Sequence, residues 1–208
     1  ELLSEYLKRE GVPHEVLTTP VGEFPSTRRI EERLLEDRKF TAIAMVHHET
    51  SSGMLNPLEA VGRLAKRRHK SFLVDAVSSL GAEEIDFKNW GIDYLAASSG
   101  KCLHAYPGVS FVLIAKKEIP SLKNNKCTGV YTDVARMLEE EPAFTPAVQL
   151  CYAFDAALDE LIREGLSRSA QRGQFLDDLP IPVAEALLGG PPDFDELYRQ
   201  FHGGAAFQ

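Results

Sequence analysis

Cysteines and long apolar runs are scarce in this sequence. The chain of 208 residues holds three cysteines, Cys102, Cys127 and Cys151, too few and too scattered for a disulfide framework or a zinc site. The longest apolar run, residues 109–115, has the length of a strand, whereas a membrane helix needs roughly 20 apolar residues. No signal peptide or basic targeting arm is recognisable. These absences exclude a disulfide-rich or membrane-spanning class and favour a reducing, cytoplasmic compartment.

The sequence has fewer basic than acidic residues. The chain has 23 Lys and Arg against 31 Asp and Glu, a net charge of −8. An acidic protein repels phosphate backbones and anionic headgroups, so we expect neither a nucleic acid nor a membrane as a partner. Hydrophobic residues make up 44% and charged residues 26%, which is typical of a globular protein with its own core. Glu1 is not methionine, and we expect further sequence before it.

Residues 1–115 alternate between strand-like and helical patterns. Short apolar runs predict strands at residues 12–17, 41–46, 71–74, 92–97 and 109–115. Amphipathic helical patterns lie between them, with Ser26, Thr27 and Pro57 at helix starts. This alternation is typical of an α/β fold, a mostly parallel sheet with helices on both faces. The short connection between the last two strands predicts that these two pair antiparallel.

The pattern changes after Pro120. Residues 121–129 resemble a loop, and residues 134–141 a short acidic helix. Pro146 then opens a long helix, for which Thr145 is a candidate N-cap.

From Phe175 onward, prolines and glycines interrupt every pattern except one helical stretch at residues 194–201. We therefore divide the chain into a large α/β domain, residues 1–145, and a shortened α+β C-terminal part, residues 146–208, that begins with the long helix.

Polar residues cluster just after three of the predicted strands, where ligands bind in open α/β sheets. These clusters are residues 47–53, Asp75 with Ser78 and Ser79, and residues 98–101. Asp75 and Lys101 are the two groups that pyridoxal 5'-phosphate (PLP) requires, a carboxylate beside the pyridine nitrogen and an amine that attaches the cofactor and moves protons. Taken alone, Asp75 also fits a turn residue and Lys101 a solvated surface lysine.

The histidine pair His47 and His48 suggests a metal site, but adjacent residues on an extended segment point to opposite sides. We therefore expect no metal. Glu49 is interpreted as a hydrogen-bond acceptor rather than a catalytic base, and Ser79 as a residue that satisfies loop backbone.

Four stretches carry a resemblance to a known family: VHHETSSGMLNP, FLVDAVSSLGAEEIDF, GIDYLAASSGKCL and PGVSFVLI. They resemble the class V aminotransferases of fold type I, and within these most closely the 2-aminoethylphosphonate–pyruvate group. The resemblance implies PLP as cofactor, a small-molecule amine donor and a 2-oxo acid acceptor. In that group, 2-aminoethylphosphonate and pyruvate would give phosphonoacetaldehyde and alanine. An alanine–glyoxylate or serine-type enzyme of the same class is the alternative.

The resemblance implies a role for each matching residue. Lys101 would hold PLP covalently, and Asp75 would pair with the pyridine nitrogen. Val77 would pack on the ring face opposite the substrate, and Thr50 would reach the ring hydroxyl.

Three further positions complete the expected cofactor-binding set. Thr145 would reach the cofactor phosphate of the neighbouring subunit, which implies a homodimer with shared active sites. Ser99 and Gly100 would contact the cofactor from the segment just before Lys101. Gly100 departs from the family, where this position usually carries an amide near the phosphate, so its contact would come from the backbone.

Two other family features have no counterpart in this sequence. These are the glycine-rich N-terminal segment that cradles the phosphate and the C-terminal arginine that binds the substrate carboxylate. Their absence supports another alternative, a non-catalytic remnant with a structural or interaction role. A cysteine desulfurase would need a reactive cysteine in a late loop, whereas Cys151 is expected in the core, on the apolar side of its helix.

Overall fold

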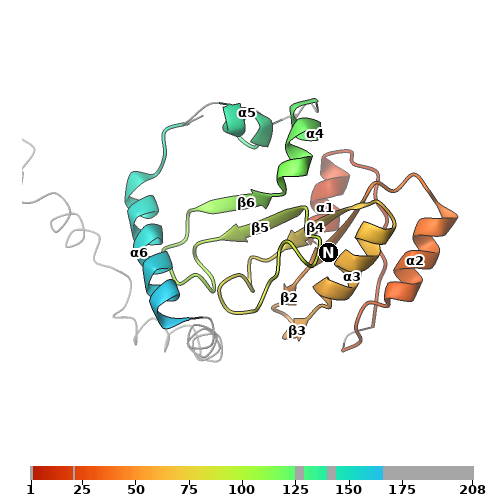
Figure 1. The fold of residues 1–208 in the computed structure, drawn as a ribbon. Coiled ribbons are helices and arrows are strands. Elements are labelled where there is room, and N and C mark those ends of the chain that lie inside the picture. Colours follow the sequence, from red (N-terminus) through yellow and green to blue (C-terminus); the bar gives the residue numbers. More distant parts are fainter. Residues whose placement is uncertain (1, 21, 125–128, 140–143, 166–208) are drawn as a thin grey trace, which may run out of the picture.

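The structure is a computed structural model that describes residues 2–20, 22–124, 129–139 and 144–165. Its centre is a four-stranded sheet in the order β1-β4-β5-β6 (Figure 1). The strands are β1 (Ala42–Val46), β4 (Ser71–Asp75), β5 (Tyr94–Ser98) and β6 (Ser110–Ile114). The first three are parallel and β6 is antiparallel to β5, which confirms both sheet predictions. A small hairpin of β2 (His48–Glu49) and β3 (Met54–Leu55) follows β1.

The helices are α1 (Leu2–Arg9), α2 (Thr27–Glu36), α3 (Leu58–Arg67), α4 (Ile119–Asn124), α5 (Val134–Glu139) and α6 (Val148–Glu164), with a 3-10 turn η1 (Lys116–Glu118) before α4. Two predicted helix starts are confirmed. The amide of Arg29 donates to the hydroxyl of Ser26, the N-cap of α2, at 3.3 Å, and Pro57 stands at the N-cap of α3.

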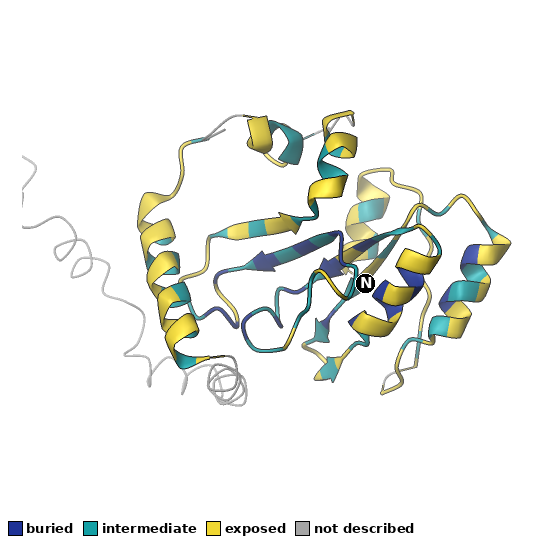
Figure 2. Ribbon diagram, viewed as in Figure 1, coloured by how far each residue is buried: buried dark blue, intermediate teal, exposed yellow. Residues whose placement is uncertain are grey.

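The core lies between α3 and one face of the sheet (Figure 2). Val61 and Leu64 of α3 and Phe72 and Leu95 of the sheet are fully buried. Helix α2 packs against α3 and adds Ile30 and Leu34 to the same core. The layer order is therefore sheet, α3, α2.

Helices α3 and α6 cover the same face of the sheet. Phe111 of β6, whose strand partner Ala97 belongs to the core, contacts Phe154 of α6 with ring centroids 5.5 Å apart. Helix α6 therefore packs on the same face as α3. On the opposite face Leu73 and Val112 are 36% and 45% exposed. The expected helical cover on both faces is not seen in this part of the chain.

Residues 12–17 do not form the predicted strand. Val12, Val16 and Leu17 are exposed, and no strand of the described sheet pairs with this segment. An extended segment becomes a strand only when a neighbour supplies hydrogen bonds, so an apolar alternation is not sufficient. Residues 121–124, predicted as loop, instead belong to α4 and continue the turn of η1.

Two predictions about α6 are wrong. The helix begins at Val148 with Ala147 as N-cap, so Thr145 does not cap it. Cys151 is exposed rather than in the core, because Leu150 and Phe154 form the contacting stripe and Cys151 lies one position around the helix.

The predicted helix at residues 194–201 lies outside the described residues. The division into residues 1–145 and 146–208 stays a prediction for the same reason. None of the described helices is long and apolar enough to cross a membrane.

Candidate functional site

The carboxyl ends of β1, β4 and β5 lie at one edge of the sheet, because these strands are parallel. Asp75 is the last residue of β4 and pairs with Val46 on one side and Ala96 on the other. Strand β5 ends at Ser98, and Lys101 follows three residues later. Asp75 and Lys101 therefore lie in segments at the carboxyl ends of two neighbouring strands, at the same edge of the sheet.

The Asp75 carboxylate is held by its own turn. One oxygen, Oδ1, accepts the amide of Val77 at 3.0 Å, and the Asp75 carbonyl accepts the amide of His47 at 2.8 Å. Both Asp75 and Val77 are half-buried. Within the described residues Oδ2 has no hydrogen-bond partner.

Ser78 joins the three segments that carry the predicted cofactor residues. Its hydroxyl accepts the Thr50 hydroxyl at 2.9 Å, and its carbonyl lies 2.9 Å from Nδ1 of His48. The same carbonyl accepts the thiol of Cys102, the neighbour of Lys101, at 3.4 Å. Sequence reasoning missed this role, and its only signal was a serine placed three residues after the end of β4.

His47 and His48 bind different parts of the turn after β4. Nδ1 of His47 lies 3.0 Å from the hydroxyl of Ser79, while His48 binds the Ser78 carbonyl. Because a carbonyl only accepts, Nδ1 of His48 carries a proton. Burial, reinforced by the nearby charge of His48, lowers the pKa of His47 to about 4. At neutral pH His47 is therefore uncharged, and it holds this turn by its hydrogen bond to Ser79.

Two predictions about nearby polar residues are confirmed. Oε1 of Glu49 accepts both the hydroxyl of Ser51 at 2.9 Å and its amide at 3.2 Å, and these bonds lower the pKa of Glu49. Ser79 is fully buried, and its hydroxyl lies 3.5 Å from the Ala76 carbonyl as well as next to His47.

The Lys101 side chain is exposed and has no hydrogen bond or ion pair within the described part of the chain. The two residues before Lys101, in contrast, make contacts within the protein. The hydroxyl of Ser99 is buried and donates to the Tyr106 carbonyl at 2.6 Å, and Gly100 lies against Pro107. Thr145 is exposed before α6 and, among the described residues, has no hydrogen bond.

A family model of the class V aminotransferases matches residues 5–180, which include every residue of this cluster. The chain belongs to the class V aminotransferases.

Several curated members of this family are similar in sequence. A 2-aminoethylphosphonate–pyruvate transaminase of Paraburkholderia phymatum is 36% identical over 163 residues, which are 76% of this chain and 44% of the relative. The same enzyme of Klebsiella pneumoniae is 40% identical over 147 residues, 68% of this chain and 40% of the relative.

Solved structures of two aminotransferases share the fold. An alanine–glyoxylate aminotransferase from Nostoc sp. is 31% identical with a TM-score of 0.74, covering 84% of this chain and 48% of the other. A ureidoglycine–glyoxylate aminotransferase from Bacillus subtilis is 26% identical with a TM-score of 0.75, covering 82% and 46%. The chain thus spans less than half the length of each of these four relatives.

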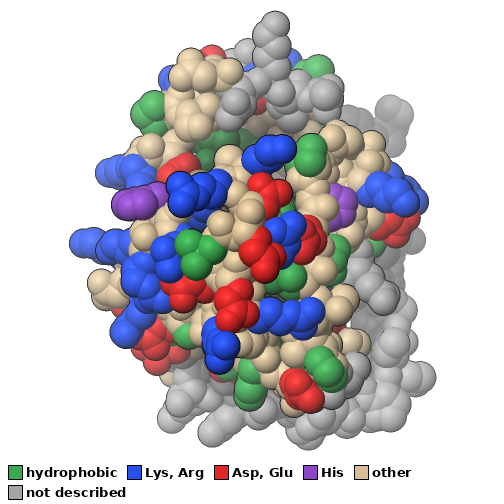
Figure 3. All heavy atoms as spheres, turned by 90° about the vertical axis from the view of Figure 1, so that its right-hand side faces the viewer, with side chains coloured by type: hydrophobic (Ala, Val, Ile, Leu, Met, Phe, Trp, Pro, Cys, Tyr) green, Lys and Arg blue, Asp and Glu red, His purple; other side chains and the backbone are tan. Residues whose placement is uncertain are grey.

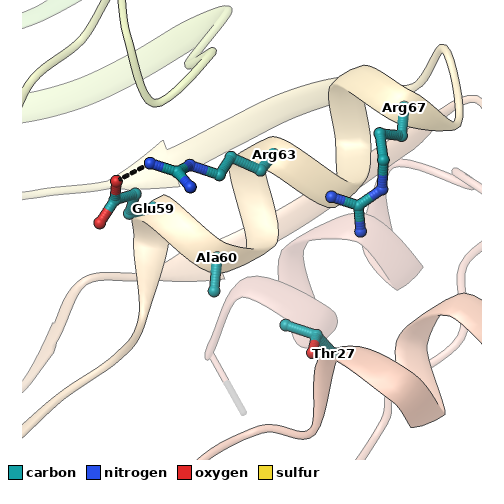
Figure 4. A pocket seen from close by; sticks show the side chains of 5 residues that line it. All are labelled: Thr27, Glu59, Ala60, Arg63 and Arg67. Carbon is teal, nitrogen blue, oxygen red and sulfur yellow. Dashed lines mark hydrogen bonds and ion pairs between the residues drawn. The ribbon is translucent and has the colours of Figure 1, made fainter.

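Two hollows in this class V aminotransferase chain lie away from the strand-end cluster. One, of about 290 Å³, lies between α2 and α3 and is lined by Thr27, Glu59, Ala60, Arg63 and Arg67 (Figure 4). Arg63 is paired with Glu59 at 2.5 Å. On the side of the molecule shown in Figure 3, basic and acidic side chains are interspersed.

The second hollow, of about 340 Å³, is apolar and lies between α6 and the sheet. It is lined by Leu80, Gly81, Leu103, Phe111, Phe154, Leu158 and Leu161. Neither hollow is lined by Asp75, Thr50 or Lys101.

Proposed function

We propose that the strand-end cluster is a PLP site and that this chain transfers an amino group from a primary amine to a 2-oxo acid. One observation carries the proposal. In a class V aminotransferase chain, Ser78 ties together the segments that bear Asp75, Thr50 and Lys101 at the carboxyl edge of a parallel sheet.

The residues at this edge have the chemistry that PLP requires. When bound, PLP supplies a protonated pyridine ring that withdraws electrons from the substrate. The free Oδ2 of Asp75 would accept the pyridinium N–H, and the orientation of this carboxylate is already set by Val77. The Thr50 hydroxyl can accept a further hydrogen bond while it donates to Ser78. The exposed amine of Lys101 would attach the cofactor and, once displaced, move a proton.

We propose 2-aminoethylphosphonate as the amine donor and pyruvate as the acceptor. The relatives from Paraburkholderia phymatum and Klebsiella pneumoniae carry that activity in their names and are 36% and 40% identical. An alanine–glyoxylate reaction is the second candidate, because the structure of the Nostoc enzyme is similar over 84% of this chain. A non-catalytic role is the third, because Gly100 departs from the family pattern just before Lys101.

We further propose that the chain acts as a homodimer in which Thr145 of each subunit contacts the cofactor phosphate of the other. The exposure of Thr145 and its lack of a hydrogen-bond partner among the described residues support an external contact.

The first test is an absorbance spectrum of the protein with added PLP. The covalent link to Lys101 should give a visible-to-near-ultraviolet band that is absent from Lys101→Ala and unchanged in Lys116→Ala, a control at an exposed lysine of η1. Addition of 2-aminoethylphosphonate or alanine separately should then show which donor removes the band. No band in the native protein at saturating PLP would contradict the proposal and favour the non-catalytic role.

A further inference from the structure

Residues 99–109 form a closed loop, here called the lysine loop, that carries Lys101. Ser99 closes it with its backbone and its side chain. Its amide donates to the Val109 carbonyl at 2.9 Å, and its carbonyl accepts the Ala105 amide at 3.1 Å. Its hydroxyl donates to the Tyr106 carbonyl at 2.6 Å and accepts the Val109 amide at 3.3 Å. Ser99 itself is 0% exposed.

The Ser99 hydroxyl is therefore committed to the loop. A serine hydroxyl has one proton to donate, and this one is donated to the Tyr106 carbonyl. A direct bond to a cofactor would take this donor from the Tyr106 carbonyl and remove one of the bonds that close the loop. The hydroxyl thus serves the shape of the loop.

Position 100 must be glycine because Pro107, on the opposite arm of the same loop, lies close to it. A Cβ at Gly100 would lie 2.8 Å from both Cα and Cβ of Pro107. Contacts that close are forbidden, and a proline backbone cannot rotate away as a flexible side chain can. Any side chain at position 100 must therefore push the two arms of the loop apart.

Lys101 is held on its C-terminal side. Its carbonyl accepts the His104 amide at 2.9 Å, and the next residue, Cys102, is buried with its thiol on the Ser78 carbonyl. The side chain of Lys101 is left exposed. The place of its amine thus depends on whether the loop is closed.

We propose that Ser99 and Gly100 are positioning residues that close the lysine loop, set the place of the Lys101 amine and contribute no side-chain contact to a cofactor. This inference rests on the proposed attachment of PLP to Lys101. For Gly100 it opposes the expectation from the family pattern. From the family pattern, an amide side chain at position 100 would add a contact to the cofactor phosphate. In this chain the same side chain must open the loop, because Pro107 lies too close.

The first arm of the test measures loop closure in the absence of PLP. Hydrogen exchange of the Val109 and Ala105 amides should be roughly fivefold faster or more in Ser99→Ala and Gly100→Asn than in the native protein, because hydrogen bonds of the loop are lost. Ser98→Ala is the control, since its hydroxyl has no partner among the described residues. If Gly100→Asn does not fold, Gly100→Ala introduces only the Cβ. Unchanged exchange in the Ser99 and Gly100 variants would overturn the inference.

The second arm separates positioning from contact by use of a Lys101→Ala background, where PLP binds only non-covalently. With Lys101 present, Ser99→Ala and Gly100→Asn should slow formation of the absorbance band by roughly fivefold or more. In the Lys101→Ala background the same changes should leave the dissociation constant of PLP unaltered, as measured by equilibrium dialysis. Weaker binding of PLP with Ser99→Ala in that background, or tighter binding with Gly100→Asn, would show a direct contact and overturn the inference.

The two proposals fail in different ways. A native protein without any band at saturating PLP contradicts the proposed function, and the exchange arm then decides loop closure by itself. A native protein with the band, together with unaltered band formation in Ser99→Ala and Gly100→Asn, contradicts only the inference.

Discussion

At the scale of single residues, the adjacent histidines after β1 act on one turn from two directions. His47 is 2% exposed, lies 3.0 Å from the Ser79 hydroxyl and contacts the Trp90 ring edge-on at 6.4 Å. His48 binds the Ser78 carbonyl. Two histidine side chains at a neighbouring strand end therefore hold the turn that follows Asp75 by hydrogen bonds. The pKa of one of them, His47, is lowered by burial.

Stability should fall as the pH is lowered toward 4. The pKa of His47 is about 4 in the folded chain, against 6.5 for an unperturbed histidine. Between these values the unfolded chain takes up a proton that the folded chain does not, so acid favours unfolding. The free energy of unfolding should drop by about 2 kcal/mol between pH 7 and pH 5, measured by urea titration.

His47→Gln should flatten this pH dependence, whereas His69→Asn, at an exposed histidine, should not. Equal slopes in the native protein and His47→Gln would contradict a buried neutral His47. Carboxylates titrate in every variant and cancel in the comparison.

At the scale of elements, the packing of α3 depends on a glycine inside the helix. Gly62 is buried, and a Cβ there would lie 1.9 Å from the Trp90 carbonyl oxygen. Glycine in a helix costs about 1 kcal/mol relative to alanine. Here the helix accepts that cost because the backbone at Trp90 approaches closely.

Gly62→Ala should therefore destabilise the protein despite its better helix propensity. We expect a loss of about 1–3 kcal/mol, typical of an overpacked core, from the shift of the urea midpoint. Ala60→Gly, at an exposed position of the same helix, should cost about 0.5–1 kcal/mol through propensity alone. A more stable Gly62→Ala variant would contradict the contact with Trp90.

At the scale of the whole molecule, apolar surface remains open on the described body. Leu73 and Val112 are exposed on the second face of the sheet, and Tyr152 and Ile162 of α6 are 70% and 78% exposed. Apolar surface of this kind often marks an association surface. It agrees with the proposed homodimer, in which each site takes Thr145 from the other subunit.

Complementation tests the shared site. Alone, Lys101→Ala should form no absorbance band, and Thr145→Ala should bind PLP roughly tenfold more weakly or worse, as expected for a lost hydrogen bond to a charged phosphate. In a hybrid dimer of the two variants, one site keeps both native residues and should bind PLP with native affinity. A mixture that binds no better than Thr145→Ala alone would contradict the shared site.

Much of the fold follows from local patterns in the sequence. The runs that became β1, β4, β5 and β6 were recognisable because apolar content and strand length are properties of a short segment. The start of α2 was recognisable because Ser26 caps it locally. Residues 12–17 were not, because whether an alternating segment forms a strand depends on a partner far along the chain.

Residue type, position at predicted strand ends and family resemblance were enough to single out the residues that could do chemistry, Asp75, Thr50 and Lys101. How these residues are held together follows from contacts made in the folded chain. Ser78 bridges them because β4 pairs with β5 in a register that carries its carbonyl to Cys102. Gly100 is required because Pro107 folds back onto it. Both effects depend on contacts between residues distant in sequence, and the register and closure that create such contacts are set by packing of the whole chain.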